Sequence, residues 1–252
     1  PDPHTPTPYQ LEAVHSKIFE TKTTAVRDSL ILSFYEDVGL RKSEVLSLTV
    51  DDIPSWDQID KAKDINEGFI LKITGKGDKI RHVLVPAELM ERSREYIEED
   101  RRAVEGKVRK KYSGYISKKA LFIGETTGRE LNSQYLSRRL SKIMAEAGIE
   151  GATPHRIRAT YIETQVEARD GYDSSGHPLP AEQVLWKVGE LVGHSSAQST
   201  RPYLNKIRSK SYSSVNEQII DKTFKLNDLN RKVLHKQSEL RRIEGVTKIM
   251  QL

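Results

Sequence analysis

Two short motifs near the C-terminal end of the chain contain the side chains that are best suited to catalysis. His155 and Arg158 stand three positions apart, and His194 precedes Tyr203 by nine positions. The sequence contains no cysteine, so disulfides, thiolate nucleophiles and thiolate zinc sites are excluded. Two imidazoles, a guanidinium and a phenol can together break a phosphodiester bond, with the phenol as nucleophile and the cations stabilising charge on phosphorus.

Two further cations lie earlier in the chain, each beside a glycine. Arg41 stands in G-L-R-K-S-E-V-L-S-L, and Glu44, three residues later, is within reach to orient its guanidinium. Lys76 lies between Gly75 and Gly77, where a mobile turn could carry an ammonium group onto a leaving oxygen. Each of these patterns alone is more often structural than functional, so it is their combined order along the chain that indicates a function.

The elements that must position these side chains are predicted to be mostly helical. Apolar spacing predicts helices in residues 9–47, with one ending at Gly39 and a new turn beginning at Ser43. Alternating apolar residues on either side of the Gly75–Asp78 turn predict a β-hairpin over residues 68–86. Further helices are expected at residues 87–112, 131–148, 155–168 and 182–192, with an exposed loop at 170–180.

The chain divides into three predicted parts. Residues 1–8 read as a linker, residues 9–210 as a catalytic domain and residues 211–252 as a helical tail, and the whole as the C-terminal domain of a longer protein. In the tail, Leu226, Leu229, Val233, Leu240 and Ile243 follow helical spacing. A final helix packed on the core and a helix that docks on a neighbouring protomer or forms a short coiled coil both fit this spacing.

Composition limits the class of protein. The 252 residues include 41 Lys+Arg and 36 Asp+Glu, a net charge of +5, and 36% are hydrophobic. This proportion can build a core at this length, and the modest excess of positive charge suits a polyanionic partner without proving one. Because no apolar run reaches membrane-spanning length and no signal peptide is visible, we expect a soluble, cytoplasmic protein.

The chemical residues, taken in order, resemble the catalytic domain of the tyrosine recombinases, the family of phage integrases and Xer-type recombinases. The matching stretches are G-L-R-x-S-E-x-L-x-L, the G-K-G hairpin, T-P-H-x-x-R, and L-V-G-H-S-S followed by T-x-x-Y. The resemblance covers about residues 8–210 and implies a mostly α fold with a small antiparallel β-sheet (α+β). It assigns six catalytic residues: Arg41, Lys76, His155, Arg158, His194 and Tyr203.

Three features depart from the family pattern. The interval from Arg158 to His194 is longer than expected, and the excess lies in the loop Asp170 to Pro180. The segment after Tyr203 is also long. The N-terminal core-binding domain with which family members complete a DNA clamp has no counterpart in these residues.

The resemblance implies a metal-free mechanism with no cofactor. Tyr203 would attack the scissile phosphate and form a 3′-phosphotyrosine, with His155 as base. Arg41 and Arg158 would clamp the non-bridging oxygens, supported by Glu44. His194 would donate a hydrogen bond to the phosphate, and Lys76 would protonate the leaving 5′-oxygen.

The implied partners are a double-stranded DNA recombination site and three further copies of the chain, assembled through the tail. An accessory directionality factor is a further candidate partner, and no membrane is involved. The biological context would be integration, excision or transposition of a mobile element. Phosphate contacts should dominate DNA affinity. The candidate DNA contacts outside the active site are Lys79, Arg81, Lys110, Lys111, Arg138 and Arg139.

Three alternatives remain. A type IB topoisomerase shares the chemistry but acts as a monomer, and a telomere resolvase uses the same chemistry to make hairpin ends. A catalytically silent DNA-binding protein of the same fold is the non-enzyme alternative, which the presence of all six residues disfavours. A metal-dependent nuclease fits poorly, because Asp51-Asp52 reads as an ordinary strand end.

Overall fold

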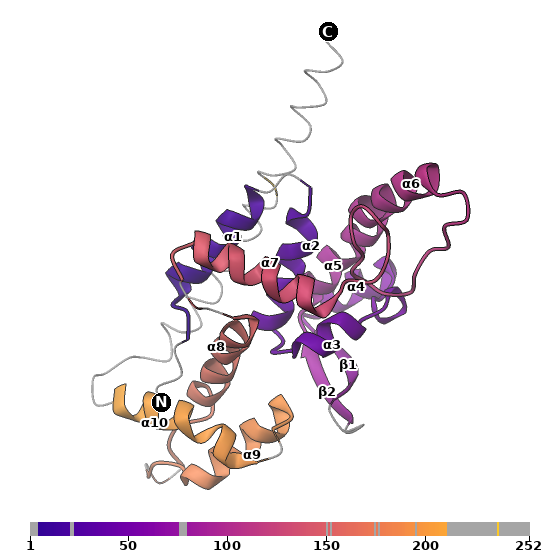
Figure 1. Cartoon of the computed structure of the whole chain (residues 1–252). Coiled ribbons are helices and arrows are strands. Elements are labelled where there is room, and N and C mark those ends of the chain that lie inside the picture. Colours follow the sequence, from indigo (N-terminus) through magenta and orange to yellow (C-terminus); the bar gives the residue numbers. More distant parts are fainter. Residues whose placement is uncertain are drawn as a thin grey trace.

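The computed structural model describes residues 5–20, 23–75, 80–149, 151, 153–173, 175, 177–194, 196–210 and 236. In these ranges the elements are helices and one two-stranded antiparallel sheet, which confirms the predicted fold class. Figure 1 shows a main helical body from which α8 (Pro154–Glu167) descends to α9 (Ala181–Val192) and α10 (Arg201–Lys210). The hairpin β1 (Phe69–Thr74) and β2 (Ile80–Val85) projects on the same lower side.

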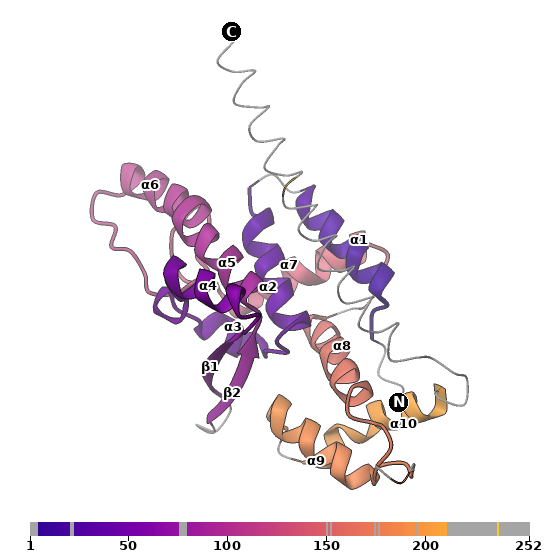
Figure 2. The same ribbon diagram turned by 180° about the vertical axis from the view of Figure 1, so that it is seen from behind.

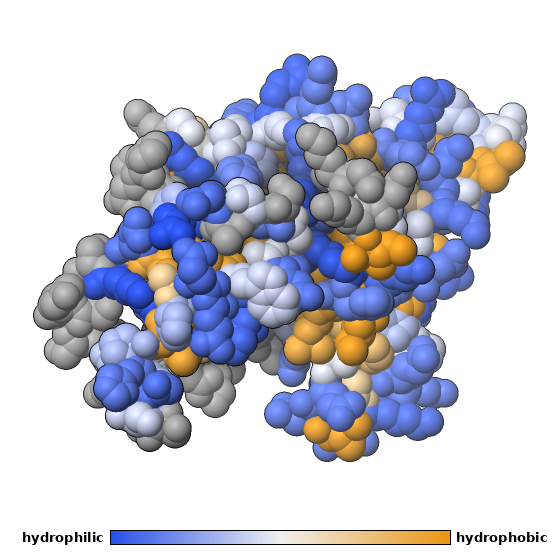
Figure 3. All heavy atoms as spheres, turned by 90° about the horizontal axis from the view of Figure 1, so that it is seen from below, coloured by the Kyte–Doolittle hydropathy of each residue, from blue (hydrophilic) through white to orange (hydrophobic). Residues whose placement is uncertain are grey.

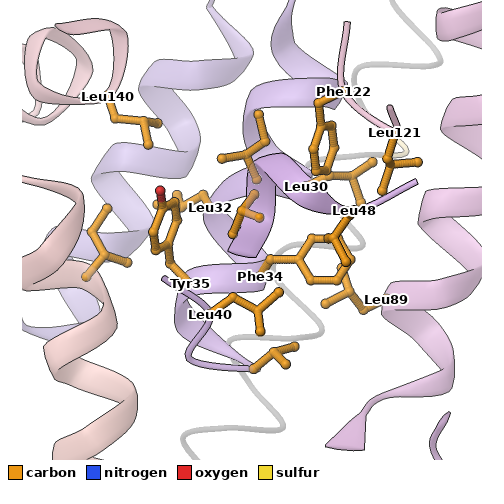
Figure 4. Close-up of a cluster of buried hydrophobic side chains, with 14 of the residues drawn as sticks. Leu30, Leu32, Phe34, Tyr35, Leu40, Leu48, Leu89, Leu121, Phe122 and Leu140 are labelled. Atoms are coloured by element: carbon orange, nitrogen blue, oxygen red, sulfur yellow. The ribbon is translucent and has the colours of Figure 1, made fainter. Parts of the chain in front are cut away.

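The main body is built around α2 (Ala25–Glu36), which is buried along almost its whole length. Phe34 on this helix meets Phe122 edge to face, with 6.1 Å between ring centroids, at the centre of the apolar cluster in Figure 4. α1 (Pro8–Phe19) packs beside α2, and its start is fixed because Thr7 and Gln10 each accept a hydrogen bond from the other's backbone N–H.

The hairpin follows the predicted alternation. Phe69 pairs with Val85 and Thr74 with Ile80, so residues 71, 73, 83 and 85 face the core. The cross-strand partners Ile70 and Leu84 are exposed on the opposite face. Seen from below, the surface is largely hydrophilic and its apolar side chains form separate patches (Figure 3).

The segment after α3 (Lys42–Ser47) differs from expectation. The strand end predicted at Asp51-Asp52 is wrong, because these residues form a 3₁₀ turn, Val50–Asp52. The Asp52 carboxylate accepts hydrogen bonds from the N–H of Thr49 (2.7 Å) and its hydroxyl (2.8 Å), which favours a helical turn. A further helix that we did not predict, α4 (Trp56–Asp64), follows it.

The helix predicted over residues 87–112 is present as a continuous helical stretch in three parts. α5 (Ala87–Tyr96) leads through a π-helical turn (Ile97–Arg101) into α6 (Arg102–Lys111). In both ribbon views α6 lies at the end of the molecule away from the hairpin and α9 (Figures 1 and 2). The predicted helix at residues 131–148 is α7 (Ser133–Glu146), which packs against α1, α3 and α8.

The last three described helices form a second, smaller core. Ala159, Ile162 and Val166 of α8 pack with apolar residues of α9 and α10. Arg208 of α10 ties down the ends of the predicted 170–180 loop, because its guanidinium donates to the Asp170 carboxylate and to the Leu179 carbonyl oxygen. The predicted tail, residues 211–252, lies outside the described residues except for position 236.

None of the helices within the described ranges is long and apolar enough to span a membrane.

Candidate active site

Arg41 stands at the start of α3, directly after the turn that ends α2. Its backbone N–H donates to Glu44 Oε2 (2.7 Å), and its Nη1 donates to Glu44 Oε1 (2.9 Å). Its Nη2 donates to the carbonyl oxygen of Gly193 at the end of α9. The side chain is 28% exposed, so a charged ligand can reach the guanidinium while Glu44 and Gly193 hold its orientation.

Arg158 lies on α8 with its side chain almost completely buried. Its Nε donates to the carbonyl oxygen of Gly39 (2.8 Å) and its Nη2 to that of Val192 (2.5 Å). Burial, and then the charge of Arg41, lowers the pKa of Arg158 to about 10, so the group remains a cation at neutral pH. Gly39 has a φ of +66°, and a Cβ there would lie 2.1 Å from the Tyr161 ring. A glycine is therefore required where Arg158 meets the turn after α2.

The C-terminal end of α9 gathers three guanidinium groups. The carbonyl oxygens of the consecutive residues 191, 192 and 193 accept hydrogen bonds from Arg81, Arg158 and Arg41, respectively. The last carbonyls of a helix have no partners within the helix and carry partial negative charge, so they attract cations. Arg41, Arg81 and Arg158, called the arginine cluster below, thus meet at the residue before His194.

The two predicted histidines lie beside the arginine cluster. His155 lies in the first turn of α8, accessible to solvent on one side; partial desolvation of its ring, then the charges of Arg158 and Arg41, lower its pKa. Burial, then Arg158 and Arg41, lower the pKa of His194 to about 4, and His155 contributes as well. Both imidazoles are therefore neutral at pH 7 in the absence of a ligand. His194 Nδ1 shares a 3.0 Å hydrogen bond with the hydroxyl of the buried Thr200.

Tyr203 lies in the first turn of α10 and is a member of the smaller core. It is 7% exposed and packs in the cluster that contains Leu204 and Ile207. Burial raises the pKa of its phenol, the positive charge of Arg158 lowers it, and Glu163 raises it again. Arg158 therefore stabilises the ionised form of the phenol, but Tyr203 needs further help to lose its proton.

Of the six predicted catalytic residues, five are described, and they come from four elements that meet at one place. The sixth, Lys76, and the predicted DNA contact Lys79 lie outside the described residues. Gly75 and Ile80 are the nearest described positions on either side.

The structure separates the other predicted DNA contacts. Lys110 and Lys111 are exposed at the end of α6, away from the arginine cluster (Figure 1). Arg138 is exposed on α7. Arg139 donates to the buried carboxylate of Asp28 (3.0 Å), and Arg81 to Glu44 and to a carbonyl oxygen of α9, so both use their donors inside the protein. These internal partners disfavour Arg81 and Arg139 as contacts to DNA.

Sequence reasoning missed three residues of this arrangement. Arg81 was assigned to the surface, although the strand alternation places it on the core side with Val83, which is a signal for an internal partner. Thr200, in the T-x-x-Y stretch, was not assigned a contact with His194. Gly193, directly after the helix predicted at residues 182–192, was not assigned a role in the site, whereas its carbonyl group binds Arg41.

A comparison with protein families gives a match to the Phage integrase family over residues 8–178. Tyrosine recombinase XerC from Neisseria meningitidis serogroup C / serotype 2a is 30% identical over 181 residues, which make up 71% of this chain and 47% of XerC. Tyrosine recombinase XerD from Lacticaseibacillus casei is 29% identical over 195 residues, 77% of this chain and 55% of XerD. The chain therefore spans about half the length of the curated relatives that it matches.

Solved structures share the fold at low sequence identity. The XerH site-specific recombinase, bound to a palindromic difH substrate in a post-cleavage complex, superposes with a TM-score of 0.59 at 23% identity, over 85% of this chain and 54% of XerH. The Tn1549 transposon integrase, in complex with a circular intermediate DNA, gives a TM-score of 0.50 at 18% identity, over 85% of this chain and 66% of the integrase chain.

Proposed function

Because the chain belongs to the phage integrase family of tyrosine recombinases, we propose that it cleaves and rejoins DNA at a specific recombination site through a 3′-phosphotyrosine. The observation that carries this proposal is the meeting of Arg41 and Arg158 at the end of α9, directly before His194. Arg41 and Arg158 come from distant segments and place two positive charges together, an arrangement that a bound anion such as a phosphate would stabilise further.

The two arginines supply the phosphate clamp. Arg158 uses Nε and Nη2 on carbonyl oxygens, and its Nη1 makes no hydrogen bond to any described residue. Arg41 also has an available donor: its Nη1 and Nη2 are hydrogen-bonded, but its Nε has no hydrogen-bond partner within the described ranges. A scissile phosphate between them would receive charged hydrogen bonds on both non-bridging oxygens, and lysine could not reproduce this forked geometry.

The nucleophilic step forms the bond between the Tyr203 phenol oxygen and phosphorus and breaks the bond from phosphorus to the 5′-oxygen. The phenol proton passes to His155, which is neutral at pH 7 and can therefore accept it. His194 donates from Nε2 to the phosphate, which requires the tautomer in which Nδ1 accepts the proton of the Thr200 hydroxyl. Lys76 protonates the leaving 5′-oxygen.

Rejoining reverses these steps on a different strand. The phosphotyrosine conserves the energy of the phosphodiester, so a 5′-hydroxyl can attack it without a nucleotide cofactor. Exchange between two sites requires four copies of the chain, and we assign the contacts between them to residues 211–252. The class of biological event that we propose is the movement of a mobile DNA element, by integration, excision or transposition.

Beyond the active site, we propose Lys79, Arg138, Lys110 and Lys111 as contacts to DNA phosphates. Such contacts position the duplex without reading its sequence and make binding weaken steeply with salt. Arg138 is the most suitable of these residues for a test. It is exposed, whereas the charge of the adjacent Arg139 is paired internally with Asp28.

The experiment traps the covalent intermediate. Nicked duplexes from the ends of the parent element lose a short 5′-hydroxyl fragment after cleavage, so rejoining is blocked and the protein stays attached. The chain and its Tyr203→Phe variant are incubated with these duplexes in EDTA, and adducts are separated in SDS. We expect an adduct with the unaltered chain and none with Tyr203→Phe.

The other outcomes are informative. An adduct that survives Tyr203→Phe would disprove the assignment of the nucleophile. An adduct accompanied by relaxation of supercoiled plasmid, without exchange between two sites, would favour a type IB topoisomerase. Salt-sensitive DNA binding without an adduct, in this chain and in a version extended at its N-terminus, would favour the silent DNA-binding protein.

A further inference from the structure

Arg81 belongs to the arginine cluster but has no part in the proposed chemistry. It lies on β2, on the face of the strand that Val83 and Val85 also use, and its side chain is 9% exposed. Its Nη2 donates to Glu44 Oε2 (2.7 Å), and its Nη1 donates to the carbonyl oxygen of Leu191 (2.9 Å). One planar guanidinium therefore connects the hairpin, α3 and the end of α9.

Glu44 is held from two sides as a result. Its Oε1 accepts from Nη1 of Arg41, and its Oε2 accepts from the Arg41 backbone N–H and from Arg81. The carboxylate is 1% exposed. Burial alone would raise its pKa, but the hydrogen bonds from Arg41 and Arg81 outweigh burial and lower it. The hydrogen bonds from Arg41 and Arg81 thus both help to keep the carboxylate that orients Arg41 ionised.

The space around this contact is filled. A Cβ on Gly193 would lie 2.9 Å from Arg81 Cδ and 3.1 Å from Arg41 Nη1, so the two side chains pass the glycine at close range. Because Glu44 Oε2 accepts from Arg81 while Oε1 accepts from Arg41, rotation of the carboxylate would break hydrogen bonds to both arginines. Without Arg81, Glu44 would keep a single charged partner in a buried setting, a costly state that favours rearrangement.

We propose that Arg81 is a positioning residue that acts through Glu44 to fix the Arg41 guanidinium for binding of the scissile phosphate. This inference rests on the proposed strand cleavage. It assigns to Arg81 a role in the rate of the covalent step and only a small role in DNA affinity, because its donors face the protein.

The variants are Arg81→Gln and Arg81→Lys, with Arg94→Gln as the matched control. Arg94 is also a partly buried arginine whose guanidinium donates to protein carbonyl oxygens, those of Ile53 and Pro54, but these lie outside the arginine cluster. Arg94→Gln should therefore show how much the rate changes when an arginine that only links parts of the fold is removed.

Single-turnover adduct formation is measured on two nicked duplexes. One has an ordinary scissile phosphodiester, and the other has sulfur in place of the leaving 5′-oxygen, which departs without a general acid. We expect Arg81→Gln to slow adduct formation on the order of 10- to 100-fold on both duplexes, the usual range for a residue that orients a catalytic group. Arg81→Lys should recover part of the loss, and Arg94→Gln should retain the rate.

Two kinetic outcomes would overturn the inference. A loss confined to the oxygen-containing duplex would mean that Arg81 acts on the leaving group through the hairpin, and not through Glu44 and Arg41. An equal loss in Arg94→Gln would mean that Arg81 only stabilises the fold. Fluorescence anisotropy of DNA binding in each variant separates these effects from lost affinity, which we expect to be minor.

A second readout needs no cleavage. The Nε–H signal of Arg41, identified in ¹⁵N NMR spectra by its loss in Arg41→Lys, reports whether the guanidinium is held. We expect this signal to broaden or exchange faster in Arg81→Gln and to stay unchanged in Arg94→Gln. An unchanged signal in Arg81→Gln would refute the positioning role even if the chain forms no adduct. A changed signal in Arg81→Gln, with no adduct from the unaltered chain or from a version extended at its N-terminus, would refute strand cleavage alone.

Discussion

The cations and the nucleophile of the proposed active site are built on cores of different size. Arg41, Glu44 and Arg81 are attached to the main body, whose core has 31 buried apolar residues within the described ranges. His194 and Tyr203 belong to the part formed by the end of α8, α9 and α10, whose core has 10. Since burial of apolar area is the main stabilising contribution, the smaller part should open more readily than the main body.

α8 contributes residues to both cores, and the arginine cluster links them through hydrogen bonds to the end of α9. Within α8, Ile157 packs in the larger core and Ala159 in the smaller one. The arginines reach from the main body to the last carbonyl oxygens of α9. The phosphate-binding groups on the larger core should therefore keep their positions more strictly than the tyrosine, which lies on the part that is expected to open more readily.

The largest effect on this arrangement is expected at Gly193, whose carbonyl oxygen accepts a hydrogen bond from Arg41. Gly193→Ala should strain a backbone with φ of +66° and push a Cβ against Arg81 and Arg41. The strain should cost about 1–2 kcal/mol of unfolding free energy, and displacement of the arginines should slow adduct formation by up to about 100-fold. Urea unfolding and single-turnover trapping measure the two effects.

Gly148→Ala is the matched control. Gly148 has a φ of +81°, and a Cβ there meets nothing within 4 Å. It should therefore show a similar loss of stability with little change in the rate of adduct formation. Equal rate losses in the two variants would show that strain by itself, and not contact with the arginines, reduces activity.

The parts of the site that could be predicted from the sequence are those set by local rules. Glycines at positions 39 and 193 mark helix ends, and the segments that follow them carry Arg41 and His194. The alternation over residues 69–85 defines the hairpin, and three-residue spacing places Glu44 beside Arg41. These features depend on residues close together in the chain, which explains why their positions are predictable.

The parts that could not be predicted depend on distant partners. Arg81 meets the carbonyl oxygen of Leu191, and Arg139 meets Asp28, pairs separated by 110 and 111 positions. Local spacing does not identify the partner of such an arginine, even where, as for Arg81, the strand alternation indicates that it faces the core. α4 was missed for a different reason, since it has only 9 residues and Ile59 is its only buried one, which leaves few apolar positions from which to recognise a helical period.

A second prediction concerns the pH dependence of the unfolding free energy. The pKa of His194 is lowered from the usual 6.5 to about 4 in the folded state, so between these values the unfolded chain binds a proton that the folded chain does not. The unfolding free energy should therefore fall as the pH drops from about 6.5 towards 4. Part of this slope should disappear in His194→Asn.

Urea unfolding of both proteins at pH 7, 6 and 5 tests this expectation. Parallel curves for the unaltered chain and His194→Asn would show that the imidazole does not contribute. His155, whose pKa is also lowered, should account for part of the slope that remains, so a His155→Asn variant is measured beside it.

The smallest effect is expected at Thr200, which sets the tautomer of His194. Thr200→Val removes a hydroxyl within 3.0 Å of Nδ1 while keeping the shape of the side chain. The loss should cost about 0.5–1.5 kcal/mol of stability and slow adduct formation by roughly tenfold, because the proton can then sit on Nδ1 and leave Nε2 unable to donate to the phosphate.

Thr164→Val provides the control, since the Thr164 hydroxyl donates to the Thr160 carbonyl oxygen within α8 (3.1 Å) and to no catalytic group. Two-dimensional ¹H–¹⁵N spectra of the imidazoles should show a shift of the His194 tautomer population in Thr200→Val and none in Thr164→Val. An unshifted tautomer with a tenfold slower reaction would assign the effect to packing of α10 around Tyr203. A shifted tautomer at full rate would remove His194 from the set of phosphate donors and leave Arg41 and Arg158 to carry the charge.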